Sequence, residues 1–104
     1  MDTLARLEQT IRDRRGAAPD SSYVAKLLSR GTPEIARKVG EEAVETVIAA
    51  MSDDRPALVG EAADLLFHLM VLLEASGASL GEVLVELDRR EGTSGIAEKA
   101  ARGA

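Results

Sequence analysis

The chain has 104 residues, of which 45% are hydrophobic and only 2% aromatic, so its apolar content is mainly aliphatic and favours helices over sheets. Its net charge of −5 argues against nucleic acid and against an anionic membrane surface as partners, although a small anionic substrate that arrives with a cation is compatible with it. The sequence contains no cysteine, which excludes a disulfide framework and a thiolate metal site.

Capping residues, glycines and prolines divide the chain into five predicted helices and a tail. Thr32 is expected as the N-cap of the third helix, with Pro33 as its first residue, and Ser79 with Glu82 has the capping-box spacing that starts the fifth. No useful length alternates with period two, so the expected fold is an all-α bundle of four to five helices. The predicted helices cover residues 2–15, 23–30, 33–51, 56–75 and 80–90.

Residues 1–91 are expected to form one domain, and residues 92–104 a tail that is Gly-rich first and weakly helical later. The tetrapeptide "GTSG" at 92–95 could offer backbone amides to a phosphate, although a flexible tail is the better interpretation. The charged N-terminus "MDTLARLEQT" does not resemble a signal peptide, and the run "LLFHLMVLL" is too short to span a membrane. A soluble, cytoplasmic protein is therefore predicted.

The helix predicted over residues 56–75 is apolar nearly all round. Phe67, Met70 and Val71 point away from its main apolar stripe and are apolar themselves. A helix of this kind must be buried on nearly all sides, and a chain of this length would struggle to cover it alone. We therefore expect a homodimer in which a second copy covers one side. The stripe consists of Leu58, Ala62, Leu65, Leu66, Leu69, Leu72 and Leu73.

Acidic residues gather on the third predicted helix, in the stretch "KVGEEAVE". Glu41, Glu42 and Glu45 fall within an arc of about 100° that also holds Lys38. This arc borders the apolar stripe of the same helix, whereas a plain solvated face would usually lie opposite such a stripe. The stripe is formed by Val44, Val47, Ile48 and Met51.

A second acidic pair lies on the fourth predicted helix, where Glu61 and Asp64 share a face with His68. Two helices joined by a short turn pack antiparallel, which would bring this pair opposite Glu42 and Glu45. Four or five partly buried carboxylates would repel one another unless a hard divalent cation such as Mg²⁺ neutralised them. The alternative is a solvated glutamate face of the kind common on helices.

The acidic pattern resembles a known signature. "EEAVE", fifteen residues and then "EAAD" is similar to the Glu-Glu-x-x-Glu … Glu-x-x-Asp motif of the all-α, MazG-like nucleotide pyrophosphohydrolases. The segments "SSYVAKLLSRGTPEIARKVGEEAVETVIAA", "GEAADLLFHLMVLL" and "GTSGIAEKA" look like the phosphoribosyl-ATP pyrophosphatase family of histidine biosynthesis. The likeness runs from residue 4 to about residue 99, and the "SYVAKLL…GTP" segment points to this family within the superfamily.

The resemblance implies an Mg²⁺-dependent hydrolase that converts phosphoribosyl-ATP to phosphoribosyl-AMP and pyrophosphate. By this resemblance Glu42, Glu45, Glu61 and Asp64 are the expected Mg²⁺ ligands, the same four residues that the hairpin geometry selects. Glu41 is a candidate outer-shell carboxylate or the base that positions the attacking water. The candidate catalytic residues are Glu41 and two of the expected metal ligands, Glu45 and Asp64.

Basic residues should line the approach of such an anionic substrate. Lys38 could reach phosphate oxygens or simply pair with glutamates along its helix. Lys26 and Arg30, with Tyr23, are candidate phosphate or phosphoribosyl contacts on the second helix. His68 could reach the metal or the substrate, but a hydrogen-bonded core histidine is the favoured interpretation.

Two other functions fit parts of the sequence. A housecleaning nucleoside triphosphate pyrophosphohydrolase would keep the acidic site and change the substrate. A dimeric helical interaction module without enzymatic activity would carry its glutamates as plain surface. Specific Mg²⁺ binding and Mg²⁺-dependent phosphate release separate this module from either enzyme.

Overall fold

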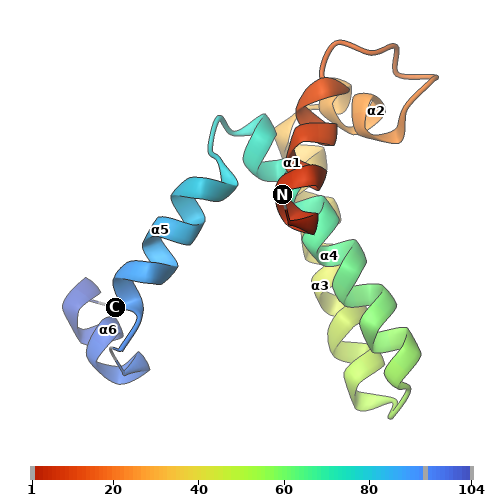
Figure 1. Cartoon of the computed structure of the whole chain (residues 1–104). Helices are drawn as coiled ribbons and strands as arrows, with labels where there is room; N and C mark the ends of the chain where they lie inside the picture. Colours follow the sequence, from red (N-terminus) through yellow and green to blue (C-terminus); the bar gives the residue numbers. More distant parts are fainter. Residues whose placement is uncertain (1, 93, 104) are drawn as a thin grey trace.

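The computed structural model describes residues 2–92 and 94–103, and within these residues it contains six α-helices and no strand (Figure 1). The prediction of an all-α fold is therefore confirmed. The last helix falls in the tail, which the sequence marked as only weakly helical; Thr93, within "GTSG", lies outside the described residues. The helices are α1 (Thr3–Asp13), α2 (Tyr23–Arg30), α3 (Thr32–Met51), α4 (Arg55–Ala75), α5 (Leu80–Arg90) and α6 (Gly95–Arg102).

Side-chain caps start most of these helices. The Ser22 hydroxyl accepts a hydrogen bond from the backbone N–H of Ala25 at 3.2 Å and caps α2. The predicted capping box of α5 is confirmed, since Glu82 N–H donates to Ser79 Oγ and Ser79 N–H donates to Glu82 Oε2. These bonds satisfy backbone donors that have no partner inside the helix.

Helices α1, α3 and α4 begin or end one or two residues from the predicted boundaries. Thr32 is the first residue of α3 rather than its cap, because Gly31 takes a φ of 90° that breaks the chain direction one residue earlier. Pro33 then sits in the first turn of α3, where its missing N–H costs nothing. At the N-terminus, α1 ends at Asp13 and begins after Asp2, whose carboxylate caps it.

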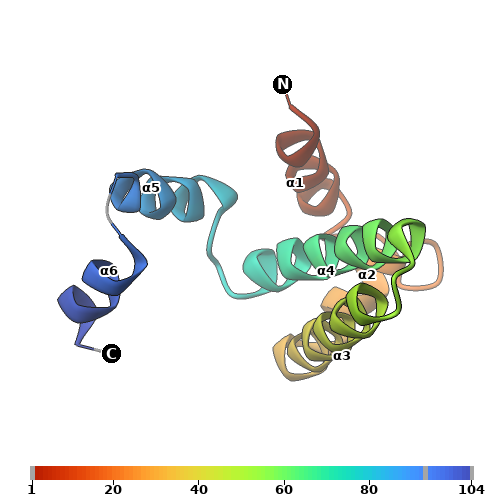
Figure 2. The same cartoon turned by 90° about the horizontal axis from the view of Figure 1, so that it is seen from below.

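Helices α3 and α4 form an antiparallel hairpin around which the rest of the protein is built (Figure 1). The turn is short: Ser52 caps the end of α3, Asp53 adopts a left-handed φ of 54°, and Asp54 caps the start of α4. Seen from below, α4 lies between α1 and α3 (Figure 2). The fully buried core side chains come from four helices and are Ile11, Leu27, Ile35 and Val71.

The core of the single chain covers only part of the leucine stripe of α4, including Leu72 and Leu73. Met70 and Val71 are buried within the chain, whereas Leu66 and Leu69 of the stripe are 47% and 39% exposed. Because α4 is apolar nearly all round, periodicity alone could not identify which side the single chain would cover. Val44, Val47, Ile48 and Met51 of α3 are exposed apolar residues as well.

Helices α5 and α6 project away from the hairpin as an arm (Figure 1). The arm begins after Gly77, which has a φ of 76°. Its first turn is anchored, since the N–H of Leu80 donates to Glu8 Oε2 at 2.7 Å and the Leu80 side chain packs against the core. The radius of gyration is 15.7 Å, compared with the roughly 13 Å typical of a compact chain of this length.

By length and composition, α4 is the one helix in the described ranges that could cross a membrane, with a mean hydropathy of 1.6 in an 18-residue window. Only 17% of that window is buried within the chain. A helix at the centre of a soluble protein satisfies the same criteria, so this observation is weak grounds for a membrane span.

Candidate active site

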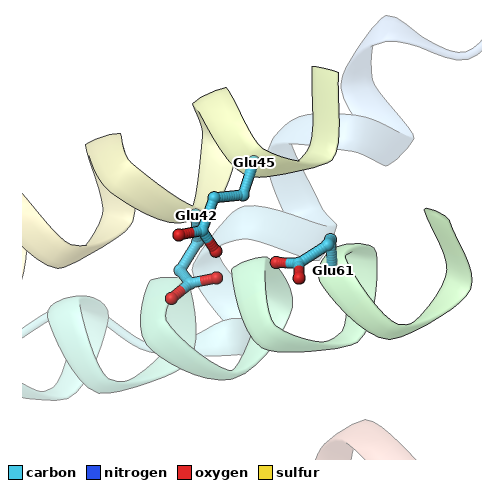
Figure 3. Close-up of side chains that lie close together, drawn as sticks. All are labelled: Glu42, Glu45 and Glu61. Atoms are coloured by element: carbon cyan, nitrogen blue, oxygen red, sulfur yellow. The ribbon is translucent and has the colours of Figure 1, made fainter. Parts of the chain in front are cut away.

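Three glutamates from α3 and α4 meet in the space between the two helices. Glu42 and Glu45 stand one turn apart on α3 and face Glu61 on α4 (Figure 3). One carboxylate oxygen from each lies within 4.8 Å of the others. The short turn sets the helix register, and the spacing of three residues on α3 puts both of its glutamates on one side. The predicted meeting of the two acidic motifs is thus present in the structure.

This proximity makes the negative charges costly. Glu45 raises the pKa of Glu61 to about 7, chiefly through a hydrogen bond that favours the protonated form, with burial and the charges of Glu45 and Glu42 adding to it. Burial and the charge of Glu45 raise the pKa of Glu42 as well. Without a cation, the cluster therefore retains protons that ordinary glutamates lose.

The cluster fits a divalent metal ion. Among the described residues, Glu42 Oε2 and Glu61 Oε2 are buried and have no hydrogen-bond partner, so both have free lone pairs. Unpaired carboxylate oxygens converging from two helices are the ligands that hard cations such as Mg²⁺ prefer. A dication would supply the partner that both oxygens lack and would remove the repulsion among the three glutamates.

The other predicted acidic residues lie around this cluster rather than in it. Asp64 is exposed and one turn beyond Glu61, near enough for its charge to raise the pKa of Glu42. The carboxylate of Glu41 pairs instead with the side chains of Arg37 and Lys38 on its own helix. The distance from Lys38 Nζ to Glu41 Oε2 is 3.6 Å, so the predicted helical pairing of Lys38 is observed.

Sequence reasoning overlooked Arg37. Its guanidinium pairs with Glu34 and Glu41, and the hydrogen bond from Arg37 lowers the pKa of Glu34. The spacings i, i−3 and i, i+4 are those at which helical side chains meet, so this pattern was available as a signal. The pairing separates Glu41 from the other two glutamates of its motif.

The candidate substrate-binding residues of α2 lie on one face of that helix. Tyr23, Lys26 and Arg30 are all exposed, and at 100° per residue they fall within an arc of about 60°. His68 is buried and hydrogen-bonded: its Nε2 lies 2.9 Å from the Tyr23 hydroxyl and its Nδ1 lies 2.8 Å from the backbone oxygen of Asp64. The favoured interpretation of His68 as a hydrogen-bonded core residue is confirmed.

The metal-free protein should lose stability as the pH rises. Glu61 holds its proton more tightly when folded, with a pKa of about 7 against 4.5, so its contribution to the free energy of unfolding is complete below 4.5 and is lost as the pH rises through 7. We expect the Tm of the chelated protein to fall by several degrees between about pH 5 and about pH 8, and Glu61→Gln, which cannot ionise, to reduce this fall.

Differential scanning calorimetry in EDTA measures both proteins, and added Mg²⁺ should restore the wild-type Tm at the higher pH. Glu86→Gln is the matched control, because Arg89 lowers the pKa of Glu86 and its removal should not reduce the fall. An equal fall in wild type and Glu61→Gln would contradict the cluster electrostatics.

Comparison with known proteins identifies the family. The model of the phosphoribosyl-ATP pyrophosphohydrolase family matches residues 4–91. The chain is 67% identical over 100 residues to the phosphoribosyl-ATP pyrophosphatase of Rhizorhabdus wittichii, covering 96% of this chain and 94% of the relative. It is 65% identical to the protein of that name from Erythrobacter litoralis, covering 99% of both, and 60% identical to the one from Rhodobacter capsulatus, covering 99% of this chain and all of the relative. The chain belongs to the phosphoribosyl-ATP pyrophosphohydrolase family.

Proposed function

We propose that this protein hydrolyses phosphoribosyl-ATP to phosphoribosyl-AMP and pyrophosphate, the second step of histidine biosynthesis. The observation that carries the proposal is the group of three glutamates shared between α3 and α4, at the positions of the motif that the family likeness also selects. Family membership supports the substrate, and the cluster supports a mechanism based on positioning and charge neutralisation.

In the proposed reaction the oxygen of a water molecule forms a bond to one of the two phosphorus atoms that flank the α–β bridging oxygen of the triphosphate. The bridging P–O bond breaks, pyrophosphate leaves, and the protons of the water are distributed between the products and the solvent. Glu42, Glu45, Glu61 and Asp64 would hold Mg²⁺, which when bound neutralises phosphoryl oxygens and lowers the pKa of coordinated water. Glu41 would act as the outer carboxylate that orients the attacking water, which requires its release from Arg37.

The phosphates would be bound by basic residues of α2 and α3. Lys26 and Arg30 share the exposed face of α2 with Tyr23, and Lys38 lies on α3 one turn before Glu42. Lys38 would exchange its partner Glu41 for a phosphate oxygen of the substrate. The two lysines would act as flexible point charges, and the planar guanidinium of Arg30 could hold two phosphate oxygens at once.

We further propose that the working form is a homodimer packed through α3 and α4. Val44, Val47, Ile48 and Met51 form one stripe on α3, and each is more than half exposed in the single chain. Gly40 lies on the same stripe, and among the described residues no neighbouring atom lies within 4 Å of where its Cβ would stand. A second copy therefore has room to approach α3 closely at Gly40.

Residues 1–91 would form the catalytic domain, which the family match over residues 4–91 supports, and residues 92–104 would be a tail. The net charge of −5 supports a small-molecule substrate rather than nucleic acid or an anionic membrane as partner. A cytoplasmic location agrees with a biosynthetic reaction on a soluble nucleotide.

The test is a pyrophosphate-release assay of the purified protein with phosphoribosyl-ATP and a panel of nucleoside triphosphates, with and without Mg²⁺. We expect phosphoribosyl-ATP to be hydrolysed with a kcat/KM at least about 100-fold above any other substrate, and activity to disappear in EDTA. Preference for aberrant or pyrimidine triphosphates would replace the proposal by a housecleaning activity. No release from any substrate, together with no specific Mg²⁺ binding by calorimetry, would leave an interaction module.

A further inference from the structure

The aromatic rings of this chain meet at one place. The sequence contains one Tyr, one Phe, one His and no Trp. Tyr23 stacks on Phe67 with ring centroids 5.9 Å apart, and His68 meets both rings edge to face, at 5.8 Å from Tyr23 and 5.1 Å from Phe67. The rings of Tyr23, Phe67 and His68 therefore all lie where α2 contacts α4, in a chain whose other apolar contacts are aliphatic.

The hydrogen bonds of His68 fix which atom donates. The backbone oxygen of Asp64 can only accept, so His68 Nδ1 carries the proton in the bond of 2.8 Å between them. In the neutral ring Nε2 is then an acceptor, and the Tyr23 hydroxyl donates to it at 2.9 Å. The phenol is thereby held by a directed bond although its side of α2 is exposed.

This bond joins two functional faces. On α2, Tyr23 shares an arc of about 60° with Lys26 and Arg30. On α4, His68 shares an arc of similar width with Glu61 and Asp64. The Tyr23 to His68 bond therefore connects the face of α2 that carries cations to the face of α4 that carries the carboxylates.

Apolar packing alone would not fix this connection. Val24 and Leu27 of α2 are buried in the core beside Val71 of α4, but such contacts are non-directional and tolerate small shifts of one helix along another. A hydrogen bond between a buried nitrogen and a ring hydroxyl has a defined length and direction. It also leaves a buried acceptor unpaired if the helices slide, which costs free energy.

We propose that Tyr23 and His68 are a positioning pair that sets the register of α2 on α4, so that a polyphosphate held by the cations of α2 is aligned with the carboxylates of α4. This inference rests on the proposed function and deepens it. His68 acts through Tyr23, and Tyr23 acts through the helix that it orients. Misalignment of reacting groups by about 1 Å can lower the rate roughly 100-fold, so a small shift of α2 after loss of this bond would be enough to slow the reaction.

The chain offers variants that separate the two bonds of His68. Tyr23→Phe keeps the ring and removes only the donor hydroxyl. His68→Asn retains a short amide donor for the Asp64 carbonyl and cannot reach Tyr23, whereas His68→Gln places an amide oxygen near the position of Nε2 and can accept from Tyr23. The experiment measures kcat and KM for phosphoribosyl-ATP at saturating Mg²⁺, Mg²⁺ affinity by calorimetry and Tm.

We expect Tyr23→Phe and His68→Asn each to lower kcat roughly 10- to 100-fold, with KM changed less than about threefold and Mg²⁺ affinity unchanged. The double variant should be no slower than either single variant, because both remove the same bond. His68→Gln should retain kcat within about threefold of wild type. A kcat for Tyr23→Phe equal to wild type, an additive double variant, or a lowered Tm with unchanged kcat of the folded protein would overturn the proposal.

A second measurement does not depend on activity. Because the chain has a single histidine, the ¹⁵N spectrum of the untagged protein reports the tautomer of His68 directly. We expect the neutral Nδ1–H tautomer in the wild type and in Tyr23→Phe, because the Asp64 carbonyl accepts from Nδ1 in both, and a changed Nε2 chemical shift in Tyr23→Phe, because Nε2 loses the donor hydroxyl. A wild-type ring protonated at Nε2 would overturn the proposal. Wild-type protein that hydrolyses no phosphoribosyl-ATP would instead refute the proposed function while the spectrum still tests the pairing.

Discussion

Replacing Glu45 by Gln, or Asp64 by Asn, is expected to lower kcat for pyrophosphate release by at least about 100-fold while the helical fold is retained. Each change keeps the size of the side chain and removes one negative charge from the edge of the site. Glu45 is the residue whose hydrogen bond and charge dominate the pKa of Glu61, so its loss removes the strongest interaction within the cluster. Both side chains are exposed, so neither change opens a cavity in the core.

Calorimetric titration and steady-state kinetics distinguish the cause of this loss. Mg²⁺ should bind more weakly to both variants than to wild type, while far-UV circular dichroism stays the same. Glu86→Gln, an equivalent change on α5, serves as the control and should keep wild-type kcat and Mg²⁺ affinity. Wild-type turnover in Glu45→Gln would show that the assigned site is wrong.

Replacing Glu41 is expected to have a different effect from replacing Glu45 or Asp64. Because its carboxylate pairs with Arg37 and Lys38 rather than with the cluster, we expect Glu41→Gln to weaken turnover without changing Mg²⁺ affinity. A kcat equal to that of wild type would remove Glu41 from the proposed reaction and leave it as a partner of Arg37.

Local signals in the sequence were sufficient for much of the fold. Ser79 and Glu82 form the capping box of α5 as predicted, because capping depends on residues within three positions of one another. The antiparallel α3–α4 hairpin follows from two long helical patterns and a short turn. Since helical spacing and the turn length set the register, the meeting of Glu42 and Glu45 with Glu61 was also predictable.

Features that depend on tertiary packing could not be predicted in this way. The bond between Tyr23 and His68 joins residues 45 positions apart, and no local pattern indicates it. Helix α4 is apolar nearly all round, so the choice of Val71 rather than Leu66 for the core is made by where α1 and α2 dock. Gly31, rather than the predicted Thr32, is the N-cap of α3. The positive φ of Gly31 ends α2 and lets α3 begin at Thr32.

The exposed apolar stripe of α3 connects the fold to the function. It borders the acidic arc, and Glu45 lies between the stripe and the core face of the same helix. In the single chain both Glu45 and Asp64 are exposed, so water reaches the edge of the site freely. A second copy covering the stripe would exclude part of this water and strengthen the electrostatic interactions within the site.

Val47→Glu should therefore convert the dimer to monomers and lower kcat about 10-fold or more. Val47 is 62% exposed in the single chain, so the substitution leaves the core of one copy intact, but it would bury an unpaired carboxylate between two copies, which is costly. Sedimentation velocity at about micromolar concentration measures the association state, and the same sample measures pyrophosphate release.

The matched control is Val85→Glu on α5. Val85 is 68% exposed and lies on α5, so the same chemical change falls outside the apolar stripe of α3. We expect this variant to sediment as the wild type does and to keep its kcat. Wild-type protein that sediments as a single monomeric species would refute the dimer, and a dimeric, fully active Val47→Glu would place the contact on another face of the hairpin.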